Sequence, residues 1–183
     1  MYQTWQMWGD VVVATLLAVP VAVVAVRLLA LRRARAGHPH PVRTALADVV
    51  ATAGTAPWIW MILTPAPGPG GVSPIPFADL RTVLDGPPQT ASVQVGGNLL
   101  VLAALGAMLP VRSARFASPA GVGAVAAVAA TASLTVETLQ YVLSLGRVSS
   151  VDDVIVNTAG AVVGALVTRR WWAVRIPAGT VPR

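Results

Sequence analysis

The chain has 183 residues, of which 55% are hydrophobic and only 11% carry a charge, whereas about 25% of residues are charged in a typical soluble domain. This composition predicts a membrane protein, and the absence of cysteine excludes a disulfide framework and a thiol nucleophile. The two histidines, His38 and His40, lie in an arginine-rich loop and do not favour a histidine triad or a zinc site, so neither a metal nor a cofactor is expected.

Five apolar runs predict an all-α integral membrane protein with five transmembrane helices in a single membrane domain, 1–183. Each run approaches the ~20 residues needed to cross a hydrocarbon core about 30 Å thick. In chain order the predicted helices are 11–31, 44–64, 92–111, 119–145 and 152–167. Between the second and third helices, 65–89 is rich in proline and glycine, which predicts a loop; within it, 77–84 is expected to form a short interfacial helix.

The arginines between these helices predict the orientation of the chain. All thirteen basic residues are arginine and lie in short loops, which favours a topological role over binding to nucleic acid. With the N-terminus outside, eleven arginines face the cytoplasm and two, Arg81 and Arg147, face outward. Because cytoplasmic loops carry an excess of basic residues, the sequence predicts an N-out, C-in arrangement.

One stretch, 137–164, combines apolar flanks with side chains that ionise or hydrogen-bond strongly. Those side chains are Glu137, Gln140, Tyr141, Arg147, Asp152, Asp153 and Asn157. Charged and amide groups are costly at membrane depth, so a cluster of them predicts a functional site. The first three share one helix face because they are three and four positions apart. The same periodicity places four residues on one face of helix 152–167: Asp153, Asn157, Gly160 and Gly164.

The predicted orientation places polar side chains of three helices at a similar depth. Asn98 and Asn157 lie roughly 7 Å below the outer ends of their helices, and Glu137 lies roughly 10 Å below the end of its own, at about 1.5 Å rise per residue. We therefore expect a polar pocket that opens outward between helices 92–111, 119–145 and 152–167. Gly160 and Gly164 form a GxxxG pair, which favours close helix packing.

The residues of this pocket have alternative interpretations. Glu137 is either a partly desolvated general acid/base or head-group anchor, or a polar contact that ties two helices together. Arg147 either binds a phosphate, which its guanidinium fork matches, or forms an ion pair with Asp152, Asp153 or Glu137. Ser150 or Asp152 is expected to cap helix 152–167, which leaves Asp153 as the better site residue.

Two further classes are disfavoured. A metal-dependent hydrolase would use Glu137, Asp152 and Asp153 as oxygen ligands, but Arg147 among them argues against a metal. A secondary transporter would usually show an inverted repeat, which this chain lacks.

The same residues resemble the VanZ-like family of membrane proteins. The resemblance is carried by Glu137, Gln140, Arg147, Asp152, Asp153, Asn157, Gly160 and Gly164, and upstream by LTP at 63–65, IPF at 75–77 and GGNLLVLAALGAMLP at 96–110. The phenylalanine and proline that usually follow the asparagine of the third helix are absent here. The VanZ-like region covers about 63–168 and is preceded by an extra N-terminal transmembrane helix, 11–31.

This resemblance implies a multi-pass protein of the bacterial cytoplasmic membrane whose namesake is associated with teicoplanin resistance. We expect the pocket to engage a lipid-linked cell-envelope molecule, such as a wall precursor, or a glycopeptide antibiotic, and so to lower teicoplanin susceptibility. Membrane lipids are the other expected partners, and nucleic acid is not. The alternative is an enzyme acting on a lipid-linked substrate. In it Glu137 and Asp153 are the catalytic residues, and the substrate is held by Asn98, Gln140, Arg147 and Asn157.

Overall fold

The computed structural model describes the backbone of residues 2–172 and the side chains of residues 17–172. Chain contacts divide the protein into two compact units, Met1–Val50 and Ala51–Arg183. The first unit holds helix α1 (Tyr2–Arg35) and the start of α2 (Pro41–Ile62). Within it, Arg33 forms an ion pair with Asp48 across the intervening loop. The predicted helix 11–31 lies inside α1, although the side chains of 11–16 are outside the described residues, as are Arg175 and Arg183.

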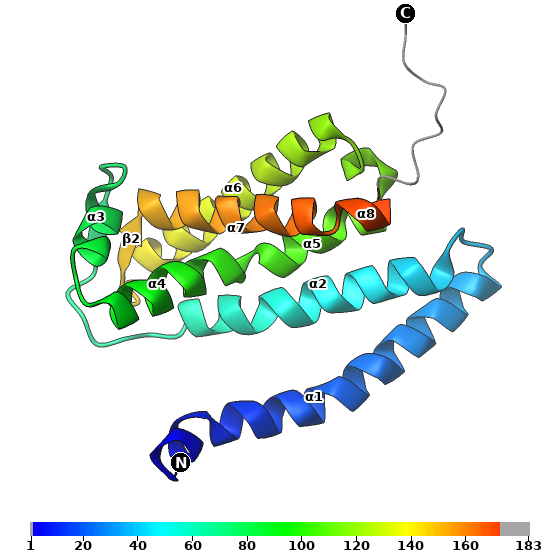
Figure 1. The fold of residues 1–183 in the computed structure, drawn as a ribbon, viewed down its shortest axis with the longest axis horizontal. Coiled ribbons are helices and arrows are strands. Elements are labelled where there is room, and N and C mark those ends of the chain that lie inside the picture. The colour runs from blue at the N-terminus through cyan, green and yellow to red at the C-terminus, as the bar shows by residue number, and fades with distance from the viewer. Residues whose placement is uncertain (1, 173–183) are drawn as a thin grey trace, which may run out of the picture. The chain divides into compact units, whose positions relative to one another are not determined.

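The second unit contains the rest of α2 and all later elements, and it is shown in Figure 1. These elements are β1 (Gly71–Ser73), α3 (Ala78–Leu84), α4 (Pro88–Val101), α5 (Ala103–Arg112), the 3-10 helix η1 (Ala114–Phe116), α6 (Pro119–Val142), β2 (Val148–Ser150), α7 (Val151–Val167) and α8 (Arg169–Trp172). Each segment predicted to be helical is therefore mainly helical, including the short helix in the 65–89 loop, but 92–111 lies in two helices and the helix predicted at 119–145 ends at Val142.

Three helical segments of the described chain are long and apolar enough to cross a membrane. They are Pro41–Ile62, Pro88–Arg112 and Pro119–Val142. Helix α7 has 17 residues and so a length of about 25 Å, at the lower limit for a transmembrane helix. The number of five crossings, the N-out orientation and the single-domain organisation stay predictions.

The helix starts follow from residues that suit the first turn. Helix α6 has Pro119 at its first position, and the Ser118 hydroxyl accepts a hydrogen bond from the Gly121 amide at 2.9 Å. Ser150, one of the two caps that the sequence predicted, caps α7 in the same way and accepts from the Asp152 amide at 3.1 Å. The segment predicted as one helix at 92–111 is broken at Leu102, whose φ and ψ of −114° and 4° separate α4 from α5.

A short parallel ribbon joins two loops that are far apart in the sequence. Val72 of β1 pairs with Ser149 of β2, with Gly71 opposite Val148 and Ser73 opposite Ser150. The nearby Ala66 amide also donates to the Leu145 carbonyl at 2.9 Å. The ribbon holds the proline- and glycine-rich loop against the start of α7. The all-α prediction did not include it.

Helix α7 packs against α4, α5 and α6 and lies at the centre of the second unit. Its glycines allow backbone contact: a Cβ built on Gly160 would lie 1.9 Å from the Leu99 carbonyl oxygen, and one on Gly164 would lie 2.3 Å from that of Ala103. From the opposite side, a Cβ on Gly106 would lie 2.0 Å from the Ala161 carbonyl oxygen. The buried cluster around these contacts is Val101, Leu102, Val125, Ala129, Ala161 and Ala165.

The close contact at Gly160 leads to a stability prediction. Gly160→Ala should lower the free energy of unfolding in detergent micelles by about 1–3 kcal/mol, because a helix backbone must move to admit the methyl group. Gly123→Ala is the control, since a Cβ on Gly123 of α6 has open space around it; this change should raise stability by up to about 1 kcal/mol. Denaturation followed by circular dichroism measures both. Equal stability of the two variants would contradict the packing described.

Candidate functional site

At one end of the second unit, α3 and β2 lie beside the starts of α4 and α7 (Figure 1). Polar side chains gather at this end, among them Glu137, Asn98 and Asp153. Two cavities lie at this end. The first is lined by α6, β1, β2 and the first residues of α7, and has a volume of about 190 Å³. The second is lined by α3, α4 and α7, and at about 20 Å³ has room for roughly one water molecule.

Glu137 lies in the wall of the larger cavity and is 6% exposed. Its carboxylate oxygen Oε2 accepts a hydrogen bond from the Ser150 amide at 3.0 Å, and its backbone carbonyl accepts from the Ser149 hydroxyl at 2.8 Å. Within the described part of the chain, no donor contacts the second carboxylate oxygen. The residue therefore ties α6 to β2 and keeps one oxygen available.

The other lining residues make this cavity amphipathic. Apolar walls come from Val72, Leu134, Val151 and Val154, and hydroxyl groups from Thr138, Tyr141, Ser149 and Ser150. Tyr141 is 58% exposed, so it lies at the open side of the cavity. An apolar cavity with a few convergent polar groups is the usual form of a ligand site.

Asp153 and Asn98, predicted to share a site, are joined directly. The Asn98 side-chain amide donates to the Asp153 carboxylate, and both residues line the small cavity. Asp79 lines it as well, and its carboxylate accepts from the Ser150 hydroxyl at 2.6 Å. Across the residues whose side chains are described, no group of three histidine, cysteine or acidic side chains is placed to hold a metal ion.

Asp152 lies in the first turn of α7, but its side chain binds the start of α3. Its carboxylate accepts hydrogen bonds from the Phe77 amide and, at 2.8 Å, from the Leu80 amide. These amides belong to the start of α3, where backbone donors have no partner within the helix. Phe77 needs this support because its φ of 65° is left-handed. Asp152 thus fixes the loop helix over the small cavity.

Gln140 and Arg147 both contact the end of α2. The Gln140 side-chain amide donates to the Ile62 carbonyl at 3.1 Å. Arg147 donates to the Thr64 carbonyl at 3.4 Å and to the Met61 carbonyl at 3.3 Å. Carbonyls at a helix C-terminus lack partners and attract positive charge. The sequence analysis offered phosphate or a carboxylate as the partner of Arg147; its partners here are backbone carbonyls.

Asn157 contacts a third helix. It is 3% exposed, and its side-chain amide donates to the Ser133 hydroxyl of α6 at 2.8 Å. The residues predicted to form one pocket therefore lie in several places. Glu137 lies at the larger cavity, and Asn98 and Asp153 lie at the smaller one. Asn157 lies between α6 and α7, and Gln140 and Arg147 contact the end of α2. Sequence reasoning missed Asp79 and the partners of Asp152, because both depend on how the 65–89 loop folds back.

The contacts of Asp152 lead to a prediction about this loop. Asp152→Ala should release the start of α3 and speed tryptic cleavage after Arg81, which is exposed in α3. A hydrogen bond to a charged acceptor contributes about 1.5–3 kcal/mol, so losing two of them removes several kcal/mol. The fraction of molecules in which the start of α3 is detached should then rise at least ~10-fold. Cleavage after exposed Arg115 serves as the internal control. An unchanged ratio of the two cleavage rates would show that Asp152 does not fix the loop.

Comparison with known proteins identifies the family. The model of the VanZ/LLP1 family matches residues 54–173, which is more than half of the chain. No curated protein and no solved structure matches the chain. The match includes Glu137, the Asn98–Asp153 pair and the glycines of α7, so it covers both cavities. The resemblance predicted from the sequence is confirmed, and this apolar, largely helical membrane protein belongs to the VanZ/LLP1 family.

Proposed function

We propose that this protein engages a lipid-linked cell-envelope molecule, or a glycopeptide antibiotic, in the cavity beside Glu137, at the outer face of the bacterial cytoplasmic membrane. The observation that carries the proposal is the carboxylate itself. It is 6% exposed, it has one oxygen bonded to the Ser150 amide, and it lines a cavity of about 190 Å³. A buried carboxylate is costly without partners, so the unfilled oxygen favours a ligand that supplies a donor.

The cavity also limits the chemistry of the ligand. A carboxylate accepts hydrogen bonds from hydroxyl, amide or ammonium groups, which are the groups of sugars and peptides. The walls formed by Leu134, Val151 and Val154 suit an apolar part of the same molecule. An amphiphile that carries sugar or peptide groups, such as a lipid-linked wall precursor or a lipoglycopeptide, combines both. Occupation of the cavity would then lower teicoplanin susceptibility.

The other predicted site residues support this cavity from outside. Asn98 holds Asp153 at the start of α7, and Ser150, which precedes that helix, holds Glu137. Asn157 joins α7 to α6, the helix that carries Glu137. In this proposal these residues position the cavity rather than contact the ligand.

An enzymatic function is the second candidate, and one observation favours it. Glu137 accepts a hydrogen bond from the Ser150 amide, so its carboxyl group lies at the start of α7, the turn that also carries Asp153. Paired carboxyl groups of this kind can exchange a proton with a substrate, with one acting as the acid and the other as the base. Glu137 would then be the general acid/base for a reaction on the lipid-linked molecule.

Glu137→Gln distinguishes these functions. Expressed in a sensitive bacterial host at matched membrane levels, the wild type should lower teicoplanin susceptibility, with vancomycin tested in parallel. The Gln variant keeps the shape and one hydrogen-bond acceptor, so binding should fall only partly, whereas acid/base chemistry should fall by roughly two to four orders of magnitude. Asp85→Asn, at an exposed acid at the end of α3, is the control and should behave as wild type. A Gln variant as protective as wild type would exclude Glu137 from the function.

The orientation can be tested independently with single cysteines, because the parent chain has none. Val148, 49% exposed in β2, and Ala114, exposed in η1, lie beyond opposite ends of α6. In the N-out arrangement, a membrane-impermeant maleimide should label Val148→Cys in intact cells and Ala114→Cys only after permeabilisation. The reverse pattern would place the Glu137 cavity on the cytoplasmic side and refute the proposed setting.

A further inference from the structure

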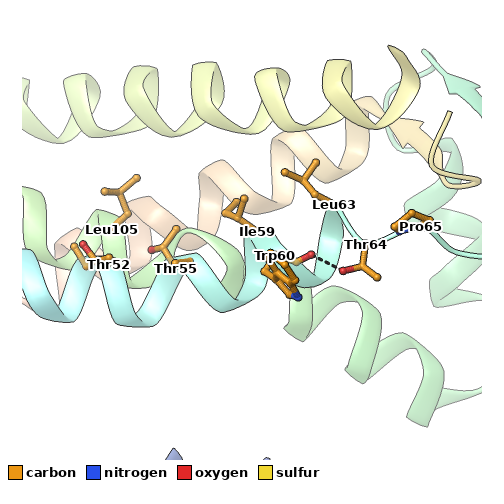
Figure 2. Close-up of a pocket in the computed structure, with 10 residues that line it drawn as sticks. Thr52, Thr55, Ile59, Trp60, Leu63, Thr64, Pro65 and Leu105 are labelled. Carbon is orange, nitrogen blue, oxygen red and sulfur yellow. Dashed lines mark hydrogen bonds between the residues drawn. The ribbon is translucent and has the colours of Figure 1, made fainter. Parts of the chain in front are cut away.

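A larger cavity lies along α2, and it shares no lining residue with either cavity at the polar end. Its volume is about 770 Å³. It is lined by Ala51, Thr52, Thr55, Ala56, Ile59, Trp60, Leu63, Thr64 and Pro65, together with Leu105 of α5. Figure 2 shows these side chains following one another along α2, with Leu105 opposite Thr52 and Thr55. The cavity is therefore an elongated groove with mainly apolar walls.

The length of this groove matches one leaflet of a bilayer. From Ala51 to Leu63 the helix rises roughly 18 Å at about 1.5 Å per residue, while half of a hydrocarbon core measures about 15 Å. The segment belongs to Pro41–Ile62, one of the helices apolar enough to cross a membrane, and Trp60 is 79% exposed on it. An apolar groove of this length at membrane depth fits one hydrocarbon chain lying along the helix.

The charge at one end of the groove indicates the head group. Thr64 and Pro65 form that end, and the Thr64 hydroxyl donates to the Trp60 carbonyl at 2.8 Å. The guanidinium of Arg147 lies beside it, since it donates to the Thr64 and Met61 carbonyls. These two contacts use two of the five N–H donors of an arginine. The remaining donors are suited to phosphate oxygens.

We infer that this groove binds one hydrocarbon chain of an anionic phospholipid, with the phosphate beside Arg147. The apolar walls favour a hydrocarbon chain, and the positive charge of Arg147 favours an anionic head group. The groove is only as long as one leaflet, which favours a lipid over a second transmembrane helix. This lipid site does not depend on the Glu137 cavity. The bound lipid would contact α2 at the end where Gln140 and Arg147 donate hydrogen bonds to its carbonyls.

The test uses purified full-length protein in phosphatidylcholine nanodiscs that contain a minor fraction of phosphatidylglycerol with a photoactivatable diazirine in one chain. Crosslinked peptides identified by mass spectrometry should concentrate on 51–65. Unlabelled phosphatidylglycerol should compete at least ~10-fold better than unlabelled phosphatidylcholine, equivalent to about 1.4 kcal/mol. This competition needs no substitution and tests the charge preference directly.

Two substitutions at one position test the groove itself. Thr55→Phe should fill the groove and reduce crosslinking to 51–65 at least ~10-fold, whereas Thr55→Val keeps the shape and should leave it unchanged. The Thr55 hydroxyl has no hydrogen-bond partner among the described residues, so its loss removes no bond. Circular dichroism and size-exclusion chromatography verify folding of both.

Equal competition by the two lipids, or crosslinking that Thr55→Phe leaves intact, would overturn the inference. A dimer that Thr55→Phe dissociates would overturn it too, because a second copy would then occupy the groove. These outcomes are read on purified protein without antibiotic. They therefore stand apart from the susceptibility assay, and failure of either proposal leaves the other open to test.

Discussion

The second unit depends on the close packing of the α7 backbone against the backbones of α4 and α5. Lipid surrounding a membrane helix is as apolar as leucine, so burial of apolar side chains drives association weakly there, and close packing of small residues takes its place. Gly160 against Leu99 and Gly164 against Ala103 provide this packing. With the helix body fixed in this way, the start of α7 is fixed too. Asp153 then meets Asn98, and Ser150 meets Glu137.

The polar side chains at that end fall into two groups, according to whether they bind a helix N-terminus or a helix C-terminus. Acidic groups accept from amides: Asp152 from the start of α3 and Glu137 from the Ser150 amide. The cationic and amide side chains of Arg147 and Gln140 donate to the carbonyls that end α2. This division follows the sign of the helix dipole, positive at N-termini and negative at C-termini. It explains how many of these polar groups are retained in a chain of this composition, and it leaves one oxygen of Glu137 facing the larger polar-end cavity.

The sequence was sufficient for the features that depend on local pattern. Apolar runs located the helices, the cap of α7 was predicted to be Ser150 or Asp152, and the glycine spacing predicted the close packing of α7. Features that depend on distant segments were not predictable in this way. The strands Gly71–Ser73 and Val148–Ser150 are too short to show an alternating pattern, and their pairing follows only from the folded arrangement. The partners of Arg147 were missed for a related reason: backbone carbonyls carry no signature in a sequence, whereas nearby carboxylates do.

The contacts between the loop after α2 and the start of α7 limit the order in which the chain can assemble. The loop after α2 leaves the ribosome long before its partners, since Phe77 and Asp152 are 75 positions apart. Until α7 is made, the amides that begin α3 lack the Asp152 carboxylate that accepts hydrogen bonds from them. Chains are synthesised from the N-terminus, and contacts between distant residues form late. The polar end is therefore completed only when α7 is made, and a chain truncated before Ser150 carries most of the apolar residues but lacks the Ser150–Glu137 and Asn98–Asp153 contacts.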